Sequence, residues 1–387
     1  MKQKLLVIAN NNIGSGQSGG DTIFLEFIKN WQKHLDITVF GSQEALNLLH
    51  RYHLTTNFIL TDKINHNCQP TTKNLIFHTF RRLYHGLISY FSHLSVFNQA
   101  DYCYTTSDFI PDHFFGWLYK ITKRSGVWLS GHYLFVPRPG SKYDPYRQQP
   151  LKGWFYYQIQ KITQYISQHF ADQILVTSDP DCGYFPHKKV IVVQGGVELV
   201  KQKQLPPISI RRFDAVFQGR LHPQKGVLEL VDIWHLVVKK IPSAKLAIIG
   251  DGQLENQLRQ KILKLKLSKN ITLFGFKTGQ EKNNIFKNSK IVVHPAIYDS
   301  GGMSAAEAMA WGLPGVSFDL ESLKNYYPQG MIKTSLGNHQ QFADNIIALL
   351  SNIKLYQKTS VEALTLIKNV WDWHHRSQIL YKQIFLG

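Results

Sequence analysis

Two carboxylates in the second half of the sequence lie close to a pair of glycines, in a segment that could bind an anion. Residues 294–314 read HPAIYDSGGMSAAEAMAWGLP, with Asp299 before the glycines and Glu307 after them. The pattern places Asp299 in a loop after a strand and Glu307 within a short Ala-rich helix. Backbone amides at the start of such a helix form a natural anion site. The candidate amides belong to Gly301, Gly302, Met303 and Ser304. The alternative is an ordinary amphipathic helix whose Glu307 faces water.

A second loop carries two cations on a backbone stiffened by proline. Residues 219–226 read GRLHPQKG and hold Arg220 and Lys225 near the end of an expected strand. A diphosphate is a natural partner, because each charge-assisted hydrogen bond contributes about 1.5 to 3 kcal/mol. The alternative is that both are solvated surface cations, which is the usual position of Lys and Arg.

A third loop, Asn10–Asp21, reads NNNIGSGQSGGD and is rich in glycine. Gly14, Gly16 and Gly19 match the GxGxxG letters of dinucleotide-binding proteins, but the first of them does not come directly off the strand, which weakens that interpretation. A better use is Gly19-Gly20 at the start of a helix, where bare amides can face a phosphate or a sugar. The alternative is a flexible loop.

Single polar residues elsewhere carry weaker signals. His132 follows an apolar strand in LSGHY, and a lone histidine in such a position is usually structural. Asp179-Pro180-Asp181 imitates the metal-binding DxD of some sugar-transferring enzymes, yet helix capping or a turn explains it more simply. We therefore predict no metal site and no bound cofactor.

The elements that must position these residues alternate between strands and helices. In the second half, strand Asp214–Gly219 is followed by apolar residues at helical spacing from Val227 to Ile241. Further strands are expected at Lys245–Gly250, Ile271–Phe274, Ile291–His294 and Gly315–Phe318. Because parallel strands need crossover connections, this alternation predicts a parallel sheet covered by helices on both faces.

The first half begins in the same way and predicts a second α/β domain. It has strand Lys4–Asn10, a helix from about Thr22 to His34 and strand Ile37–Phe40. Further strands are expected at Val127–Ser130, Gln173–Thr177 and Val190–Val193. Residues 201–212, KQKQLPPISIRR, are polar, aperiodic and contain two prolines. We therefore predict two Rossmann-like, doubly wound domains, 1–205 and 206–365.

Composition excludes several classes of protein. The 387 residues are 43% hydrophobic and 13% aromatic, which excludes disordered, collagen-like and coiled-coil chains. No apolar run approaches the length of a membrane span, so we expect a cytoplasmic protein. The formal charge of +18 predicts anionic partners, but Lys and Arg are spread along the whole chain rather than concentrated as in a nucleic-acid module. We expect no nucleic acid to bind.

One segment mixes arginines with aromatic residues. Residues 77–94 read FHTFRRLYHGLISYFSHL. Either this segment makes peripheral contact with an anionic membrane, at the inner face, or it is a helix whose aromatic face lies in the core.

The motifs of the second half resemble those of glycosyltransferase family 4, retaining enzymes with the GT-B fold. GRL-x3-KG, AIIGDGQ, ITLFGF and HPAIYDSGGMSAAEAMAWGLPG are similar to the donor-nucleotide domain of that family over residues 213–320. The resemblance implies two domains facing each other across a cleft. It also implies that residues 366–387 form a last helix crossing back to the N-terminal, acceptor-binding domain.

The resemblance assigns roles in the second domain. Arg220 and Lys225 would bind the diphosphate of a nucleotide-sugar donor, and Glu307 would bind the ribose hydroxyls. Asp299, with the amides that follow it, would contact the donor sugar and phosphates. The acceptor would be a glycan or a lipid-linked glycan, in the synthesis of a cell-surface polysaccharide or glycolipid.

In the first domain, the resemblance implies that Gly19 and Gly20 approach the same diphosphate and that His132 contacts the transferred sugar. The sequence departs from the family at three positions. Asp299 replaces a usual Glu, Gly301 replaces a usual aromatic residue, and Gly195 replaces a usual Asn. These departures leave the preferred donor sugar open.

Two other classes of function stay open on the sequence. An NAD-dependent oxidoreductase would explain two α/β domains and the GxGxxG letters, but would leave the loops of Arg220 and Asp299 without a role. A non-catalytic basic protein that binds polyanions would explain the charge alone. Binding of a nicotinamide cofactor would favour the first class, and salt-sensitive retention on DNA the second.

Overall fold

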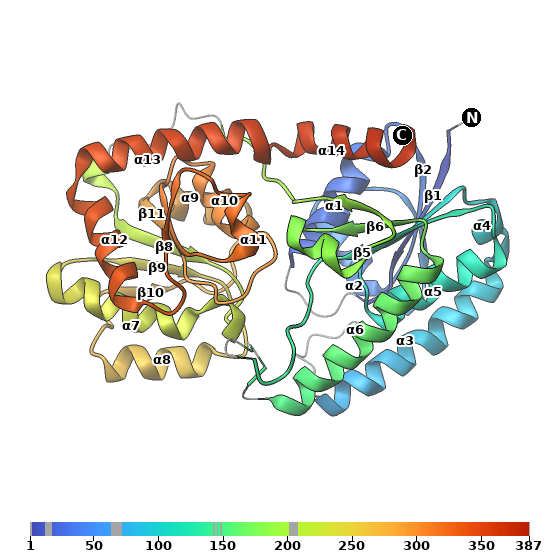
Figure 1. Ribbon diagram of the computed structural model, residues 1–387, viewed down its shortest axis with the longest axis horizontal. Helices are drawn as coiled ribbons and strands as arrows, with labels where there is room; N and C mark the ends of the chain where they lie inside the picture. Colours follow the sequence, from blue (N-terminus) through green and yellow to red (C-terminus); the bar gives the residue numbers. More distant parts are fainter. Residues whose placement is uncertain are drawn as a thin grey trace. The chain divides into compact units, whose positions relative to one another are not determined.

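The chain folds into two compact α/β units (Figure 1). The computed structural model describes residues 2–11, 18–62, 72–141, 144, 146–147, 149–200 and 208–386, with residues 72–75 described by their backbone only. The first unit comprises Met1–Gly140, Gln149–Gly195 and Ser377–Gly387, and the second comprises Ser141–Gln148 and Gly196–Arg376.

The first unit is built on a seven-stranded parallel sheet with the order β3-β2-β1-β4-β5-β6-β7. Its strands are β1 (Lys4–Ala9), β2 (Asp36–Gly41), β3 (Asn57–Leu60), β4 (Tyr102–Thr105), β5 (Val127–His132), β6 (Gln173–Val176) and β7 (Lys189–Val192). Five of the six residues of β1 are buried, as expected for a central strand covered by helices on both faces.

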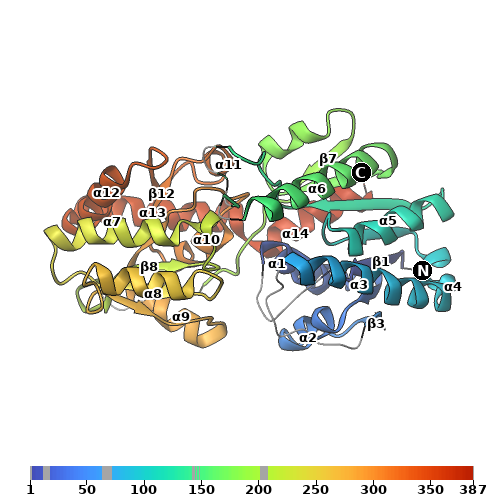
Figure 2. The ribbon, with the colours of Figure 1, turned by 90° about the horizontal axis from the view of Figure 1, so that it is seen from below.

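Helices cover both faces of this sheet (Figure 2). They are α1 (Gly19–Trp31), α2 (Gln43–Arg51), α3 (Thr72–Ser92), α4 (Leu94–Gln99), α5 (Ile110–Thr122), α6 (Pro150–Phe170), η1 (Asp179–Tyr184), the part of α14 (Trp373–Tyr381) from Ser377 on, and η6 (Lys382–Leu386). On one face, the ring of Phe385 in η6 packs edge-on against Trp31 of α1, with 5.2 Å between ring centroids. On the other face, α5 packs on β4 and β5, and α3 and α6 pack on α5.

The second unit has a six-stranded parallel sheet with the order β10-β9-β8-β11-β12-β13. Its strands are β8 (Phe213–Gln218), β9 (Leu246–Ile249), β10 (Ile271–Leu273), β11 (Ser289–His294), β12 (Gly315–Phe318) and β13 (Met331–Thr334). The order reverses between β8 and β11, and open α/β sheets bind ligands at the carboxyl ends of the strands at such a point.

The helices of the second unit complete its core. They are η3 (Ile208–Ile210), η4 (Pro223–Lys225), α7 (Val227–Lys240), α8 (Glu255–Lys264), α9 (Gly279–Lys287), α10 (Met303–Met309), α11 (Glu321–Lys324), α12 (His339–Ser351), α13 (Ile353–Leu366) and η5 (Ile367–Trp371). Side chains of α7, α8 and α12 pack on the sheet around Trp234, which is fully buried. The predicted fold class, two doubly wound α/β domains, is confirmed.

Several predicted bounds differ from the structure. The helix expected from Thr22 begins at Gly19, because the Ser18 hydroxyl accepts the Asp21 amide and caps the helix earlier. The strand expected to end at Ser130 continues to His132. The predicted domain boundary after residue 205 lies outside the described residues.

The C-terminal segment Ser377–Gly387 belongs to the first unit. Near the middle of the chain, the boundary between the two units lies between Gly195 and Gly196. Ser141–Gln148 belongs to the second unit, which no pattern in the sequence predicted.

Candidate active site

Glycines allow close backbone contacts between the loops that follow β8, β9 and β11. Gly226 has φ +63°, and a Cβ there would lie 1.9 Å from the carbonyl oxygen of Pro295. Gly250 has φ +138°, and a Cβ there would lie 1.9 Å from the carbonyl oxygen of Gly219. Only glycine allows both the positive φ and the close approach. These contacts hold the loop of Arg220 and Lys225 against its neighbours.

Asp299 is the point at which the loops after β8 and β11 meet. Its Oδ2 accepts hydrogen bonds from Lys225 Nζ at 2.5 Å and from His294 Nε2 at 3.0 Å. Its Oδ1 accepts the backbone amides of Gly301 and Gly302 at 3.3 and 3.2 Å. Burial would raise the pKa of Asp299, but the charge of Lys225 and the hydrogen bond from His294 hold that pKa well below its usual range. Asp299 is therefore ionised in the folded protein.

The start of α10 is fixed from both sides. Gly302 precedes the helix with φ +65°, and its carbonyl accepts a hydrogen bond from the Tyr327 hydroxyl at 2.7 Å. The amides of Met303 and Ser304 lie in the first turn, where helix amides have no acceptor within the helix. The Ser304 hydroxyl oxygen is buried and has no hydrogen-bond partner among the described residues. This turn therefore offers donors to an anion, whereas the amides of Gly301 and Gly302 already bind Asp299.

Glu307 lies on α10 between two donors. Its Oε2 accepts hydrogen bonds from Gln218 Nε2 at 2.8 Å and from Lys282 Nζ at 2.7 Å. The Glu307 side chain is 28% exposed, so its carboxylate is partly buried and still accessible to solvent. Neither partner was predicted from the sequence, because neither position shows a spacing that relates it to Glu307.

The two cations of the β8 loop have different surroundings. Lys225 ends η4, and its side chain is 15% exposed and paired with Asp299. Arg220 is exposed, and its side chain donates no hydrogen bond to any residue that the structure describes. The nearby ring of Tyr146 packs edge-on against His222, with 5.8 Å between centroids. Burial raises the pKa of the Tyr146 hydroxyl, and the charge of Arg220 opposes that rise.

Gly19 and Gly20 form the first turn of α1 in the other unit. Ser18 and Asp21 make a reciprocal capping box, with the Ser18 amide donating to Asp21 Oδ2 at 2.7 Å. A Cβ on Gly20 would lie 3.4 Å from the Tyr133 ring. Residues 12–17, which include Gly14 and Gly16, lie outside the described residues. Diphosphate binding by Gly19 and Gly20 stays a prediction.

His132 is fully buried within the first unit. Its Nε2 lies 2.9 Å from Ser167 Oγ, and its Nδ1 lies 3.6 Å from Asp108 Oδ2. His113 shares the same Ser167 hydroxyl at 2.8 Å, and burial lowers the pKa of His113 to about 3. Burial would raise the pKa of Asp108, but the hydrogen bond from His132 lowers it. The predicted contact between His132 and a sugar would require the side chains that cover this ring to move.

The site residues thus form two groups in the second unit and a separate set in the first. Lys225, Asp299 and the start of α10 share one hydrogen-bond network, and Glu307 lies on the same helix with Gln218 and Lys282. Within the described part of the chain, no three His, Cys, Asp or Glu side chains come together as a metal site requires.

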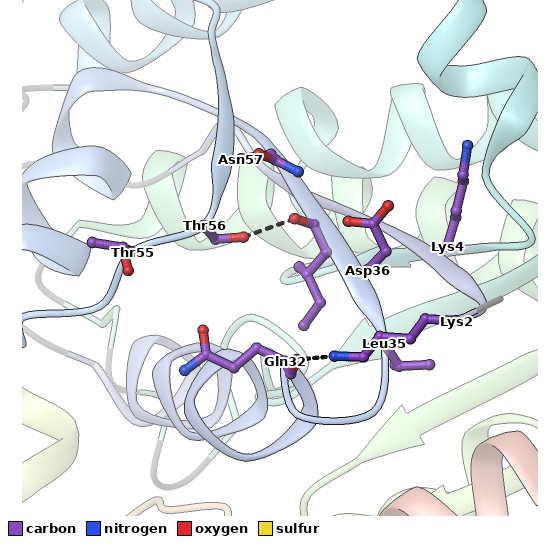
Figure 3. A pocket seen from close by; sticks show the side chains of 9 residues that line it. Lys2, Lys4, Gln32, Leu35, Asp36, Thr55, Thr56 and Asn57 are labelled. Atoms are coloured by element: carbon purple, nitrogen blue, oxygen red, sulfur yellow. Dashed lines mark hydrogen bonds between the residues drawn. The ribbon is translucent and has the colours of Figure 1, made fainter.

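The first unit has a surface pocket of about 730 Å³ at the amino ends of β1, β2 and β3 (Figure 3). It is lined by Lys2, Lys4, Gln32, Leu35, Asp36, Ile37, Thr55, Thr56 and Asn57. The Thr56 hydroxyl donates to the Ile37 carbonyl at 2.8 Å, and Lys2 Nζ donates to the Gln32 carbonyl at 3.2 Å. Dashed lines in Figure 3 mark the hydrogen bonds of Thr56 and Lys2. Ligands of parallel α/β sheets bind at the opposite edge, so we do not assign this pocket to the site.

Most of the second unit is similar in sequence to known glycosyl transferases. Residues 201–364 match the family model of the glycosyl transferases group 1. The poly(ribitol-phosphate) alpha-N-acetylglucosaminyltransferase of Staphylococcus aureus is 31% identical over 175 residues, which is 43% of this chain and 34% of that protein. The poly(glycerol-phosphate) alpha-glucosyltransferase of Bacillus subtilis is 28% identical over 160 residues, which is 40% of this chain and 23% of that protein. The matches thus span well under half the length of these relatives.

Solved structures resemble the whole chain. HepE of Anabaena, in complex with UDP and glucose, has a TM-score of 0.72 at 15% identity and is covered to 99%, as is this chain. The sucrose-phosphate synthase of Thermosynechococcus elongatus has a TM-score of 0.76 at 16% identity, with both chains covered completely. Residues 201–364 are therefore similar to the group 1 glycosyl transferases, and the chain as a whole has the GT-B fold.

Proposed function

We propose that this chain is a retaining glycosyltransferase of family 4 that moves a sugar from a nucleotide diphosphate sugar to a glycan or lipid-linked acceptor. The observation that carries the proposal is the junction of Lys225, Asp299 and the first turn of α10. It lies in the loops at the carboxyl ends of β8 and β11, and the β8 loop also carries the exposed Arg220. The similarity to polymer-modifying transferases supports a role in polysaccharide or glycolipid synthesis.

In the proposed reaction, the bond between C1 of the sugar and the diphosphate oxygen breaks while an acceptor hydroxyl attacks C1 from the same face. The proton of that hydroxyl goes to the departing phosphate. Negative charge grows on the diphosphate and the sugar gains oxocarbenium character, so groups that stabilise the diphosphate lower the barrier. We assign this role to Arg220 and to the amides of Met303 and Ser304.

Lys225, which is paired with Asp299, acts mainly by holding the first turn of α10 in place and adds positive charge beside the diphosphate. Both hydrogen bonds to Glu307 from described residues reach Oε2, so we assign Oε1 to the ribose hydroxyls. Arginine and helix amides can supply the required charge, and we propose that transfer does not depend on a metal.

We place the activity in the cytoplasm, at the inner face of the membrane. Among the helices that the structure describes, none is long and apolar enough to span a bilayer. The charge of +18 favours peripheral attraction to anionic lipid.

Thermal denaturation with a panel of UDP, GDP and ADP sugars tests the proposal. We expect one nucleotide class to raise the Tm of the wild-type protein and to lose most of that effect in Arg220→Ala. Nuclear magnetic resonance of the product with the active donor should show the donor's anomeric configuration retained, with or without EDTA. Stabilisation by NAD and not by any nucleotide sugar would instead support an oxidoreductase.

A further inference from the structure

The outer side of α3 carries an apolar stripe that faces solvent. Five large side chains recur every three or four residues: Phe77, Phe80, Tyr84, Ile88 and Phe91, which are 66%, 68%, 63%, 50% and 66% exposed. That spacing places them on one side of the helix. An ordinary surface helix exposes polar residues at such positions, so this stripe calls for a partner.

The stripe is not needed for the core, because the opposite side of α3 already packs there. Tyr90 is only 3% exposed, and a Cβ on Gly86 would lie 2.5 Å from the Phe115 ring. Arg82 is also buried and pairs with Glu44 at 2.7 Å. The helix α3 therefore carries apolar side chains on two sides, and only one of these sides is buried within the first unit.

The helix α6 has a similar outer side. Leu151, Trp154, Ile162 and Tyr165 are 80%, 55%, 59% and 64% exposed and share one side of that helix. Both α3 and α6 pack on α5, in the layer on one face of the sheet (Figure 2). We call these exposed residues of α3 and α6 the α3–α6 face.

The α3–α6 face lacks negative charge. Residues 72–100 and 145–171 contain no Asp or Glu. In α5, between the two helices, the one carboxylate is Asp112, which is buried and accepts the backbone amides of Asn10 and Asn11. Lys161 of α6 is exposed beside the Tyr157 ring. The face thus combines aromatic side chains with positive charge.

We propose that the α3–α6 face binds the surface of an anionic lipid bilayer. Exposed Phe, Tyr and Trp side chains enter the boundary between headgroups and acyl chains, and positive charge attracts anionic headgroups. A second copy of the chain fits this face less well, because each copy carries a formal charge of +18. The inference concerns binding alone and does not rest on the proposed transfer.

Vesicle flotation tests the proposal. We expect the wild-type protein to float with vesicles of phosphatidylcholine and phosphatidylglycerol, less with phosphatidylcholine alone, and less as salt is raised. The triple variant Phe77→Ser, Phe80→Ser, Phe91→Ser should bind the anionic vesicles at least about tenfold more weakly. The matched control replaces Leu263, Ile353 and Val361 of the second unit with Ser, since their exposed fractions of 67%, 57% and 63% are comparable.

Three results would overturn the proposal. The first is that the triple variant binds like the control while both keep the wild-type Tm. The second is that wild-type protein binds neutral and anionic vesicles equally. The third is a wild-type dimer that the triple variant dissociates, without vesicle binding, which would assign the face to a second copy. Binding of nucleotide sugars by each variant is measured separately, so failure here would overturn the proposed place at the membrane and leave the proposed sugar transfer untouched.

Discussion

Several hydrogen bonds of the candidate site converge on the carboxylate of Asp299. It accepts hydrogen bonds from two side chains and two backbone amides, and together these offset the cost of burying its charge. Its folded-state pKa is therefore well below the ordinary value of 3.8, despite burial. A group with a depressed folded pKa stabilises the fold above its unfolded pKa and loses that effect as the pH falls through its folded pKa.

We expect Asp299→Asn to lower the free energy of unfolding at pH 7 by on the order of 3 kcal/mol, because Lys225 loses its partner and the loop amides lose a charged acceptor. The difference between wild type and variant should shrink as the pH falls below 3.8. Urea denaturation at a series of pH values measures it. A difference that does not change with pH would show that the charge of Asp299 is not what stabilises the loops.

A substitution of Arg220 tests the role of this residue in transfer without disturbing the fold, because Arg220 is exposed. We expect Arg220→Ala to lower kcat/KM by a factor that corresponds to about 2 to 4 kcal/mol of lost transition-state stabilisation, since the guanidinium is assigned to charge that grows in the transition state. Its exposed side chain predicts an unchanged Tm. Arg259→Ala is the matched control, because Arg259 is exposed and pairs only with Glu255 on the same helix among the described residues. Equal activity of the two variants would remove Arg220 from the site.

Glu307→Gln tests the ribose assignment. An amide cannot accept hydrogen bonds from both Gln218 and Lys282 and from a ribose as a carboxylate can, so nucleotide affinity should fall by about tenfold. Isothermal titration with the nucleoside diphosphate measures it. Glu321→Gln, at a 71% exposed side chain, should bind as the wild type does. Unchanged affinity of Glu307→Gln would reject its role.

The types of the site residues were predictable, but their partners were not. Asp299 and Glu307 were found because glycines and a helix start lie between them in the sequence. The pairing of Glu307 with Lys282 depends on how α9 packs beside α10, and no local pattern encodes it. The burial of His132 likewise depends on side chains from α5 and α6.

At the scale of elements, the loops of the second unit are held together by backbone contacts that only glycine permits. Gly226→Ala would place a Cβ 1.9 Å from the Pro295 carbonyl, next to Lys225. Gly275→Ala is the matched control, because Gly275 has a similar φ of +68° and nothing within 4 Å. Both variants bear a backbone strain of about 1 to 2 kcal/mol, because alanine is placed at a positive φ.

We therefore expect Gly226→Ala to destabilise the second unit by clearly more than the control and to weaken nucleotide binding. Chemical denaturation and titration of the two variants measure the difference. If they behave alike, the junction between the two loops does not depend on this contact.

Helices and strands could be predicted from the spacing of apolar residues where only one side of the element is buried. The apolar spacing from Val227 to Ile241 predicted α7 nearly to the residue. The predicted strand ended at Ser130, because glycine and histidine are not typical strand residues. In the structure, Gly131 and His132 are buried and extend β5 to His132. Packing across the sheet decided its length, and packing is not visible in a local pattern.

At the scale of the whole molecule, the first unit is completed by the end of the sequence. The Trp31 indole nitrogen donates to the Ser377 carbonyl at 3.1 Å, and Gln173 donates to the Ile384 carbonyl at 3.3 Å. The Phe385 ring also packs edge-on against Tyr102 of β4, with 4.8 Å between centroids. The residues that cover this face of the first unit's sheet therefore follow the second unit in the sequence.

We expect deletion of residues 377–387 to destabilise the first unit selectively. Trp31 and Tyr102 would lose their apolar cover, and a buried aromatic side chain contributes about 3 to 5 kcal/mol. Calorimetry should show one transition moved to lower temperature and a second unchanged. The second unit, intact in this variant, should still bind the nucleoside diphosphate, while transfer is lost. Phe385→Ala should give a smaller shift of the same transition. If the deletion lowered both transitions equally, or left transfer intact, the end of the sequence would not be the part that completes the first unit.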